Sequence, residues 1–160
     1  MLLGLGIDVI EAARIRRLLE RLPRAYERLF SPQERAYCDD FVDPWPHYAA
    51  RFAAKEAVGK ALGIGIIGFV WRDVEVLSGG KPLVALHGGV AEVARGLGVT
   101  HLELSLSHTG GRAYAVAAAL GAGAAALAAG AGPKAAGAEA EAAGGEAGPR
   151  AADAEEAPHV

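Results

Sequence analysis

The composition of this chain changes sharply at Gly121, and the change decides which residues can form a folded core. Beyond that glycine the sequence consists almost entirely of Ala, Gly, Glu and Pro, with no aromatic residue and almost no large aliphatic one. Such a segment buries too little apolar surface to offset the entropy lost on ordering it. We therefore expect one folded domain over residues 1–121 and an Ala/Gly-rich, low-complexity, disordered tail over residues 122–160.

The charged residues and the cysteine count limit the class of protein further. Residues 1–121 carry 14 basic and 13 acidic side chains, whereas residues 122–160 carry 2 and 6, so the tail is acidic. Cys38 is the only cysteine, which excludes an intrachain disulfide and a cysteine-rich zinc site and fits a reducing cytoplasm. We expect a cytoplasmic protein whose partners include neither nucleic acid nor a membrane.

Two apolar segments bear on membrane targeting. The N-terminus lacks the basic region of a signal peptide, and Asp8 and Glu11 interrupt its apolar run. Residues 113–133 carry no charge but are mostly Ala and Gly, whereas a spanning helix needs about 20 predominantly apolar residues. We interpret this second segment as a strand that runs into the tail.

Local patterns predict the first elements. Residues 2–9 have the composition of a strand, and residues 11–22 form a helical pattern with apolar residues at positions i, i+3, i+4 and i+7. Pro23 ends this helix, because proline disfavours a helical conformation in the residue before it. A capping box at Ser31-Pro32-Gln33-Glu34 predicts a short helix that begins at Pro32.

The longest predicted helix runs over residues 47–62, and Gly63 follows it at the position of a C′ glycine. A loop punctuated by glycines comes next. Period-two alternation around glycine turns then predicts two hairpins, one over residues 72–77 and 82–87 and the other over residues 101–107 and 112–120. A short helix is expected between them, over residues 90–97. The pattern as a whole predicts an α+β fold, with an antiparallel β-sheet packed around the long central helix.

Three charged residues stand in apolar surroundings and indicate chemistry. Asp8 lies at the end of the first strand, and Glu56 and Lys60 lie on the long helix among small residues. An unpaired buried charge is costly, so two such carboxylates indicate a bound cation. Hard oxygen ligands with free coordination positions suit Mg²⁺, and a lysine suits phosphate oxygens. The pattern predicts Mg²⁺-assisted chemistry on a phosphorylated substrate.

Each of these residues also has a simpler interpretation. Asp8 could cap the helix that follows it, because aspartate is a favoured N-cap residue. Glu56 could be a solvated helix residue paired with Lys60 at i, i+4. The neighbours of Glu56 argue against the second interpretation, because Phe52 and Gly59 share its side of the helix and Gly59 permits close approach of a backbone or ligand.

Two further groups have both a functional and a simpler interpretation. Ser107-His108-Thr109 combines two hydroxyls with an imidazole and could hold a phosphate, or these could be ordinary turn residues. Arg14, Arg17 and Arg21 share the polar face of the first helix. That face could be merely solvated or could receive an acidic partner. The sequence has neither a Walker A loop at Gly59-Lys60 nor the third glycine of a dinucleotide fingerprint after Gly4 and Gly6.

Four segments together resemble the holo-acyl-carrier-protein synthase family of 4′-phosphopantetheinyl transferases. They are Gly6–Glu11, Arg51–Gly63, Gly80–Pro82 and Leu104–His108, in the order and spacing of the family. The resemblance covers about residues 1–121. It implies transfer of 4′-phosphopantetheine from coenzyme A to a serine of apo-acyl carrier protein, with release of adenosine 3′,5′-bisphosphate, in fatty acid biosynthesis.

The resemblance also assigns roles to residues. It implies that Asp8 and Glu56 bind Mg²⁺ and that Lys60 contacts the phosphates, so that these three residues form the catalytic set. It further implies that the coenzyme A site includes Gly63 and Gly65 as well as Ser107, His108 and Thr109, with the histidine near the 3′-phosphate. Arg14, Arg17 and Arg21 would then face the acidic carrier protein.

The residue at position 10 bears on the class within this family. The larger, two-domain transferases carry a third acid there, and this chain has Ile10. The resemblance therefore implies the small class, a homotrimer with each active site between neighbouring subunits. The sequence leaves open whether Glu56 or a metal-bound water accepts the proton of the serine. The competing hypothesis is a non-catalytic module that binds the carrier protein or a nucleotide.

Overall fold

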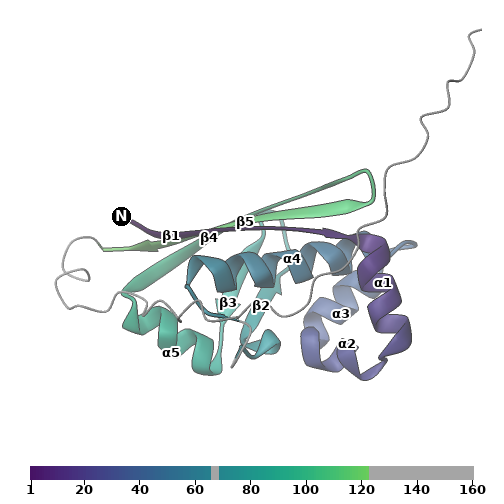
Figure 1. Cartoon of the computed structure of the whole chain (residues 1–160), viewed down its shortest axis with the longest axis horizontal. Helices are drawn as coiled ribbons and strands as arrows, with labels where there is room; N and C mark the ends of the chain where they lie inside the picture. The colour runs from purple at the N-terminus through teal and green to yellow at the C-terminus, as the bar shows by residue number, and fades with distance from the viewer. Residues whose placement is uncertain (66–68, 123–160) are drawn as a thin grey trace, which may run out of the picture.

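The computed structural model describes residues 1–65 and 69–122 and confirms the predicted α+β class. The predicted elements occur in the expected order, with one short helix and one 3₁₀ turn in addition (Figure 1). They are β1 (Leu2–Glu11), α1 (Ala12–Arg21), α2 (Arg24–Leu29), α3 (Pro32–Asp39), α4 (Trp45–Ala61), the 3₁₀ turn η1 (Trp71–Asp73), β2 (Val74–Leu77), β3 (Leu83–Leu86), α5 (Gly88–Gly96), β4 (Val99–Thr109) and β5 (Arg112–Gly121).

Two antiparallel sheets enclose the long helix. β1, β5 and β4 form a three-stranded sheet with β5 in the middle, and β2 pairs with β3 in a separate hairpin. Figure 1 shows α4 running beneath the three-stranded sheet, with α1, α2 and α3 gathered at one end and α5 at the other. The helix therefore occupies the centre of the domain, as the sequence predicts.

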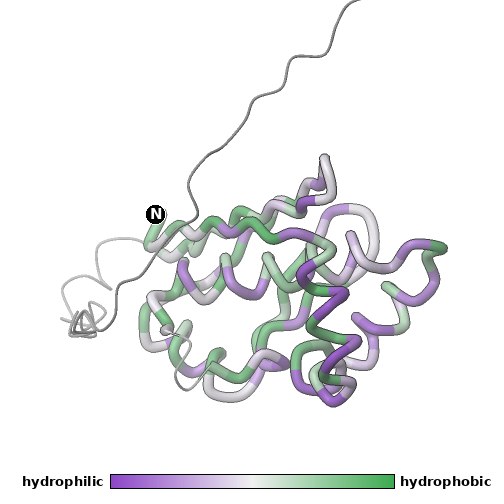
Figure 2. The backbone as a smooth tube through the Cα atoms, turned by 45° about the vertical axis from the view of Figure 1, so that its right-hand side comes forward, coloured by the Kyte–Doolittle hydropathy of each residue, from purple (hydrophilic) through white to green (hydrophobic). Residues whose placement is uncertain are grey.

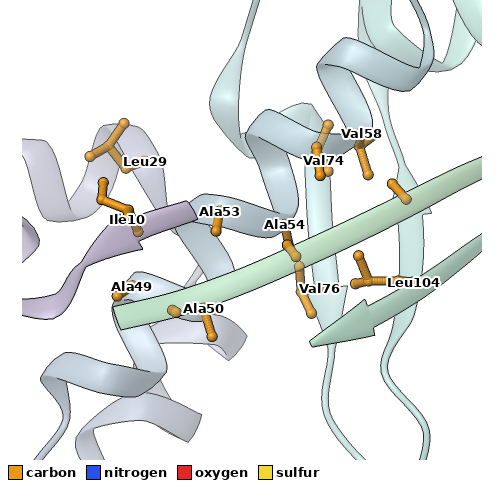
Figure 3. Packing of buried hydrophobic residues seen from close by; sticks show 14 of the residues in the cluster. Ile10, Leu29, Ala49, Ala50, Ala53, Ala54, Val58, Val74, Val76 and Leu104 are labelled. Carbon is orange, nitrogen blue, oxygen red and sulfur yellow. The ribbon is translucent and has the colours of Figure 1, made fainter. Parts of the chain in front are cut away.

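Small residues allow α4 to be buried on most of its surface. Ala53, Ala54, Ala57 and Val58 are fully buried in the core that α4 shares with the sheets. Figure 3 shows alanines of α4 against valines of β2 and Leu104 of β4. A helix that is apolar on nearly all sides belongs in the interior, and alanine lets neighbouring backbones approach it closely.

Two glycines set the distance between β1 and α4. A Cβ atom at Gly4 would overlap the carbonyl oxygen of Ala61, and one at Gly6 would overlap that of Ala57. Gly59, by contrast, has only ordinary contact distances around it, with Phe69 at 3.4 Å from the position of a Cβ. The close backbone approach that the sequence suggested at Gly59 therefore occurs instead at Gly4 and Gly6.

Helix α4 ends in a regular capping motif at Gly63. This glycine has a φ of 67°, its N–H donates to the carbonyl of Lys60, and the N–H of Ile64 donates to the carbonyl of Gly59. These two bonds define a Schellman motif, which confirms the predicted C′ glycine. The helix begins at Trp45, two residues earlier than predicted, because proline at position 46 is tolerated in a first helical turn.

The other elements agree with the predictions except for one short helix and for Arg72 and Asp73, which lie in η1 rather than in the strand predicted over residues 72–77. The capping box of α3 is present, with Ser31 Oγ accepting from the N–H of Glu34 and the Glu34 carboxylate accepting from the N–H of Ser31. Both hairpins and α5 also form. Helix α2 was not predicted, because its six residues are too few for a periodic pattern to stand out.

The outer face of the three-stranded sheet is apolar on β1 and β5. Leu5, Ile7 and Val9 alternate with the residues that face α4 and are more than half exposed, and Val116 lies opposite Ile7. Figure 2 shows the strands largely in the colours of apolar and neutral residues, whereas hydrophilic positions recur along the helices at one end. None of the described helices is long and apolar enough to cross a membrane. The predicted tail, apart from Ala122, lies outside the described residues.

Candidate active site

Asp8 and Lys60 form an ion pair between β1 and α4. The Lys60 ammonium donates to Asp8 Oδ1 at 2.8 Å and to the carbonyl oxygen of Ile7 at 2.9 Å. Asp8 lies on the helix-facing side of β1, two residues after Gly6, so the close packing of strand on helix brings the pair together. The Lys60 side chain remains 51 % exposed and that of Asp8 16 %. The pair is therefore accessible to a ligand.

Glu56 lies one turn earlier on α4 and faces the same groove as Asp8. Burial raises the pKa of Glu56, and the nearby negative charge of Asp8 raises it further, while Lys60 opposes both effects. The two carboxylates are thus close enough to repel each other. A cation between them would remove this repulsion.

Both simpler interpretations of these acids are wrong. The N-cap of α1 is Glu11, and α1 has no side-chain capping bond, so Asp8 does not cap it. Lys60 pairs with Asp8 of β1 rather than with Glu56 at i, i+4. Both acids face the groove between elements that are distant in sequence.

A groove of about 700 Å³ runs from these carboxylates along α1. Its walls come from β1, α1 and α4. The residues that line it are Asp8, Val9, Ile10, Arg14, Ile15, Arg17, Leu18, Arg21, Leu22, Phe52 and Glu56. The helical pattern predicted that the arginines of α1 lie on the face opposite to its leucines. In the structure, Leu18 and Leu22 border the same groove as the arginines. The reason is that α1 buries chiefly Ile15 and Leu19 in the core. The basic side chains and the carboxylates therefore belong to one continuous surface.

The donor set of this groove fits Mg²⁺. Asp8 and Glu56 provide hard carboxylate oxygens, and one oxygen of Asp8 is already held by Lys60. Mg²⁺ is commonly bound through one or two carboxylates, with substrate phosphates and water completing its coordination. The described residues contain no cluster of three or more His, Cys, Asp or Glu side chains that could hold a metal ion. Two carboxylates with an open side match a metal shared with phosphates.

Gly63 and Gly65 lie on the loop that leaves the C-terminal end of α4, close in sequence to Lys60. Gly63 is required by the helix cap, and Gly65 has open space around the position of a Cβ. Neither glycine lines the groove of Asp8 and Glu56. Their contact with coenzyme A stays a prediction.

The segment Ser107-His108-Thr109 is not a single cradle. Ser107 and Thr109 occupy alternate positions of β4 that face away from α4, whereas the His108 ring lies 6.2 Å from the ring of His47 on α4. All three side chains are exposed, and none lines the groove of Asp8 and Glu56. Strand β5 separates β4 from β1, a distance of about 10 Å across two strand spacings. Within one chain, therefore, the structure does not bring this segment to the carboxylates.

Sequence reasoning missed a buried ion pair next to the site. Lys55 and Glu34 both have fully buried side chains, and their charged atoms lie 2.8 Å apart. A signal was present, because Lys55 follows Ala53 and Ala54 in a helix rich in small apolar residues. The partner, Glu34, could not be recognised, because its place in the capping box already accounts for a glutamate at this position. Cys38 offers no alternative chemistry, because burial raises the pKa of its thiol to about 12.

Comparison with known proteins identifies the family. The sequence profile of the 4′-phosphopantetheinyl transferase superfamily matches residues 4–119. The chain belongs to this superfamily. It is therefore an enzyme of the phosphopantetheinyl transferase class, and its groove contains the candidate active site.

Individual relatives agree over most of the chain. The holo-acyl-carrier-protein synthase of Desulforudis audaxviator is 50 % identical over 124 residues, which are 76 % of this chain and 95 % of that protein. That of Caldanaerobacter subterraneus is 43 % identical over 118 residues, 72 % of this chain and 93 % of that protein.

Solved structures show the same fold. The holo-acyl-carrier-protein synthase of Neisseria meningitidis superimposes with a TM-score of 0.68 at 31 % identity and covers 75 % of this chain and 99 % of its own. The Helicobacter pylori enzyme, solved in complex with coenzyme A, has a TM-score of 0.63 at 32 % identity and covers 72 % of this chain and 99 % of its own.

Proposed function

We propose that this enzyme transfers 4′-phosphopantetheine from coenzyme A to a serine of apo-acyl carrier protein in a Mg²⁺-dependent reaction and releases adenosine 3′,5′-bisphosphate. The observation that carries this proposal is the shared groove, in which Asp8 and Glu56 stand at one end and arginines of α1 along the side. Relatives named for this activity support it. The reaction would take place in the cytoplasm and supply fatty acid biosynthesis.

The carboxylates and Lys60 would have different roles in binding the pyrophosphate of coenzyme A. Asp8 and Glu56 would hold Mg²⁺, which when bound neutralises charge on the pyrophosphate oxygens. The Lys60 ammonium has three N–H donors, of which two bind Asp8 and Ile7 in the described part of the chain. The third donor can reach a phosphate oxygen, so Lys60 would orient the diphosphate while it holds Asp8 in place.

The arginines of α1 would receive the carrier protein. Arg14, Arg17 and Arg21 line the groove that ends at the carboxylates, with Leu18 and Leu22 between them. Carrier proteins of this kind are acidic, and an alternation of basic and apolar side chains suits an acidic, amphipathic helix. A carrier protein bound there would direct its serine toward Asp8 and Glu56.

A homotrimer would complete the site. The outer sheet face exposes Leu5, Ile7 and Val9, with exposed fractions of 62 %, 64 % and 53 %, and contiguous apolar faces of this kind mark interaction surfaces. Ser107 and Thr109 lie on the same outer face, two strands from Val9. Association through this face would bring Ser107 and Thr109 to the border with a neighbouring subunit, where they would contact coenzyme A. Contact of coenzyme A with His108, which lies on the α4 side of β4, stays a prediction.

The decisive experiment is transfer itself. Apo-acyl carrier protein incubated with coenzyme A, Mg²⁺ and the full chain should gain about 340 Da, the mass of the phosphopantetheine group, by mass spectrometry. Omission of the divalent ion should abolish the shift. Absence of transfer with every divalent ion tested would contradict the proposal and favour a binding module. Sedimentation of the same sample tests the trimer independently.

A further inference from the structure

The fully buried ion pair of Lys55 and Glu34 holds four elements together. Glu34 comes from α3, and its carboxylate accepts from the N–H of Ser31 at 2.8 Å and from the N–H of Val76 on β2 at 3.0 Å. The Lys55 ammonium lies 2.8 Å from the same carboxylate. It also donates to the carbonyl oxygens of Trp71 at 3.0 Å and of Val74.

This arrangement leaves the lysine no freedom. An ammonium has three donors, and here each one has an acceptor, on Glu34, Trp71 or Val74. Since the side chains of Lys55 and Glu34 are completely buried, water cannot replace a broken bond. The position of α4 relative to α3, η1 and β2 is therefore fixed at Lys55.

Glu56 lies between this anchor and a second one. Successive helix residues are rotated by about 100°, so Lys55 flanks Glu56 on one side, and Lys60, four residues later, lies about 40° to the other side. Lys60 is held to β1 through Ile7 and Asp8. The two lysines thus fix the rotation of α4 on both flanks of Glu56.

An aromatic contact connects the buried pair with the groove a second time. The ring of Trp71, whose carbonyl binds Lys55, stacks on Phe52 with 4.8 Å between centroids and 19° between planes. Phe52 lines the groove beside Glu56, one helical turn before it. Loss of the buried pair would therefore disturb both the backbone and the wall next to Glu56.

We propose that Lys55 and Glu34 are positioning residues that hold the Glu56 carboxylate in the orientation needed to share a divalent cation with Asp8. Stability alone does not account for such a pair, because well-packed apolar residues often replace a buried ion pair without loss of stability. Groups that hydrogen-bond to a metal ligand orient it, and their loss typically changes metal affinity about 10- to 100-fold. Lys55 would orient Glu56 through the helix backbone that the two neighbouring residues share. The proposal rests on the proposed function only for the identity of the ion.

The test uses a variant that removes both buried charges together. Lys55→Met with Glu34→Gln leaves no uncompensated charge, whereas either change alone would leave one and could unfold the chain. The readouts are the Kd for Mn²⁺ alone, measured by electron paramagnetic resonance, and the Mg²⁺ concentration for half-maximal transfer. We expect both to rise about tenfold or more, with the KM for carrier protein unchanged. Val90→Ala, a buried change in α5 away from the groove, controls for lost stability.

The possible results separate this proposal from the proposed function. A folded double variant that binds Mn²⁺ like the wild type would overturn the positioning role, as would an equal weakening in Val90→Ala. If the double variant does not fold, Lys55→Arg, which keeps the charge but not the geometry, takes its place with the same two readouts. Failure of the wild type to transfer would refute the proposed function, yet Mn²⁺ binding would still test the positioning role.

Discussion

Two lysine–carboxylate pairs flank the same turn of α4, and they have the same length but opposite environments. Lys55 with Glu34 and Lys60 with Asp8 are both 2.8 Å ion pairs between α4 and another element. The first is fully buried, whereas in the second the lysine is 51 % exposed. Equal geometry therefore does not mean an equal role.

The difference lies in what can replace each partner. Around Lys60, water or the phosphates of a substrate can take over a hydrogen bond, so the pair can open and exchange partners at small cost. Around Lys55 no such exchange is available, and a lost partner leaves a charge in the interior. The exposed pair suits ligand binding, and the buried pair suits a fixed framework behind it.

Removal of each lysine in turn tests directly whether burial distinguishes the two ion pairs. Lys55→Met should lower the free energy of unfolding by about 3–5 kcal/mol, because Glu34 keeps a buried charge without a counter-ion. Lys60→Met should lower it by only about 1 kcal/mol, because removal of the half-exposed lysine opens Asp8 to solvent. Urea denaturation of both variants measures the difference. Similar losses would show that burial does not distinguish the two pairs.

Transfer activity, unlike stability, should depend strongly on a residue of the exposed groove, Glu56. Glu56→Gln keeps the shape of the side chain and removes a charged oxygen ligand, so transfer should fall by about 100-fold or more with the fold intact. Transfer at limiting Mg²⁺ is the measurement, and circular dichroism checks the fold. Wild-type transfer rates in this variant would contradict the role of Glu56 as a metal ligand.

The close contact of β1 with α4 can be tested at a single glycine. Gly6→Ala places a methyl group against the carbonyl of Ala57, and such overpacking should cost about 1–3 kcal/mol of stability. It should also separate Asp8 from Lys60 and lower transfer. Gly96→Ala in α5 is the matched control, because open space surrounds that position. If both variants melt at the same temperature, the glycine does not set the distance.

Variants of the groove arginines test whether this exposed surface binds the carrier protein. Reversal of Arg14 and Arg21 to Glu should raise the KM for carrier protein about tenfold or more and leave that for coenzyme A nearly unchanged. Added salt should weaken the wild type in the same selective way, since screening acts over about 8–10 Å. Reversal of the exposed Arg72 and Arg95, which lie outside the groove, changes the net charge equally. An equal effect there would indicate bulk charge alone.

The smallest expected effect comes from pH. Burial and Asp8 raise the pKa of Glu56, so in the metal-free fold its ionised form is disfavoured relative to the unfolded chain. The resulting destabilisation is present above the folded pKa and disappears as the pH falls below the ordinary glutamate value. Metal-free Glu56→Gln should therefore melt slightly higher than the wild type at pH 7, by about 1–3 °C, and show no gain near pH 4. A lower melting temperature at pH 7 would contradict the assigned repulsion.

Most of the elements and the candidate catalytic residues could be predicted from the sequence, because they depend on local patterns. The capping box at Ser31, the glycine after α4 and the period-two hairpins depend on neighbours a few residues apart, so their patterns are legible in the chain. Asp8, Glu56 and Lys60 stood out because charged residues in apolar runs require a partner. The resemblance of four short segments to a family then implied a chemistry for them.

How these groups meet depends on the packing of β1, α1 and α4, which only the three-dimensional structure shows. This packing pairs Lys60 with Asp8 and places the closest backbone approach at Gly4 and Gly6 rather than at Gly59. It also brings the arginines into one groove with the carboxylates. The partner of Lys55 is 21 residues away along the chain on another helix. Contacts between distant segments follow from shape complementarity over the whole core, and no short window of the sequence contains that information.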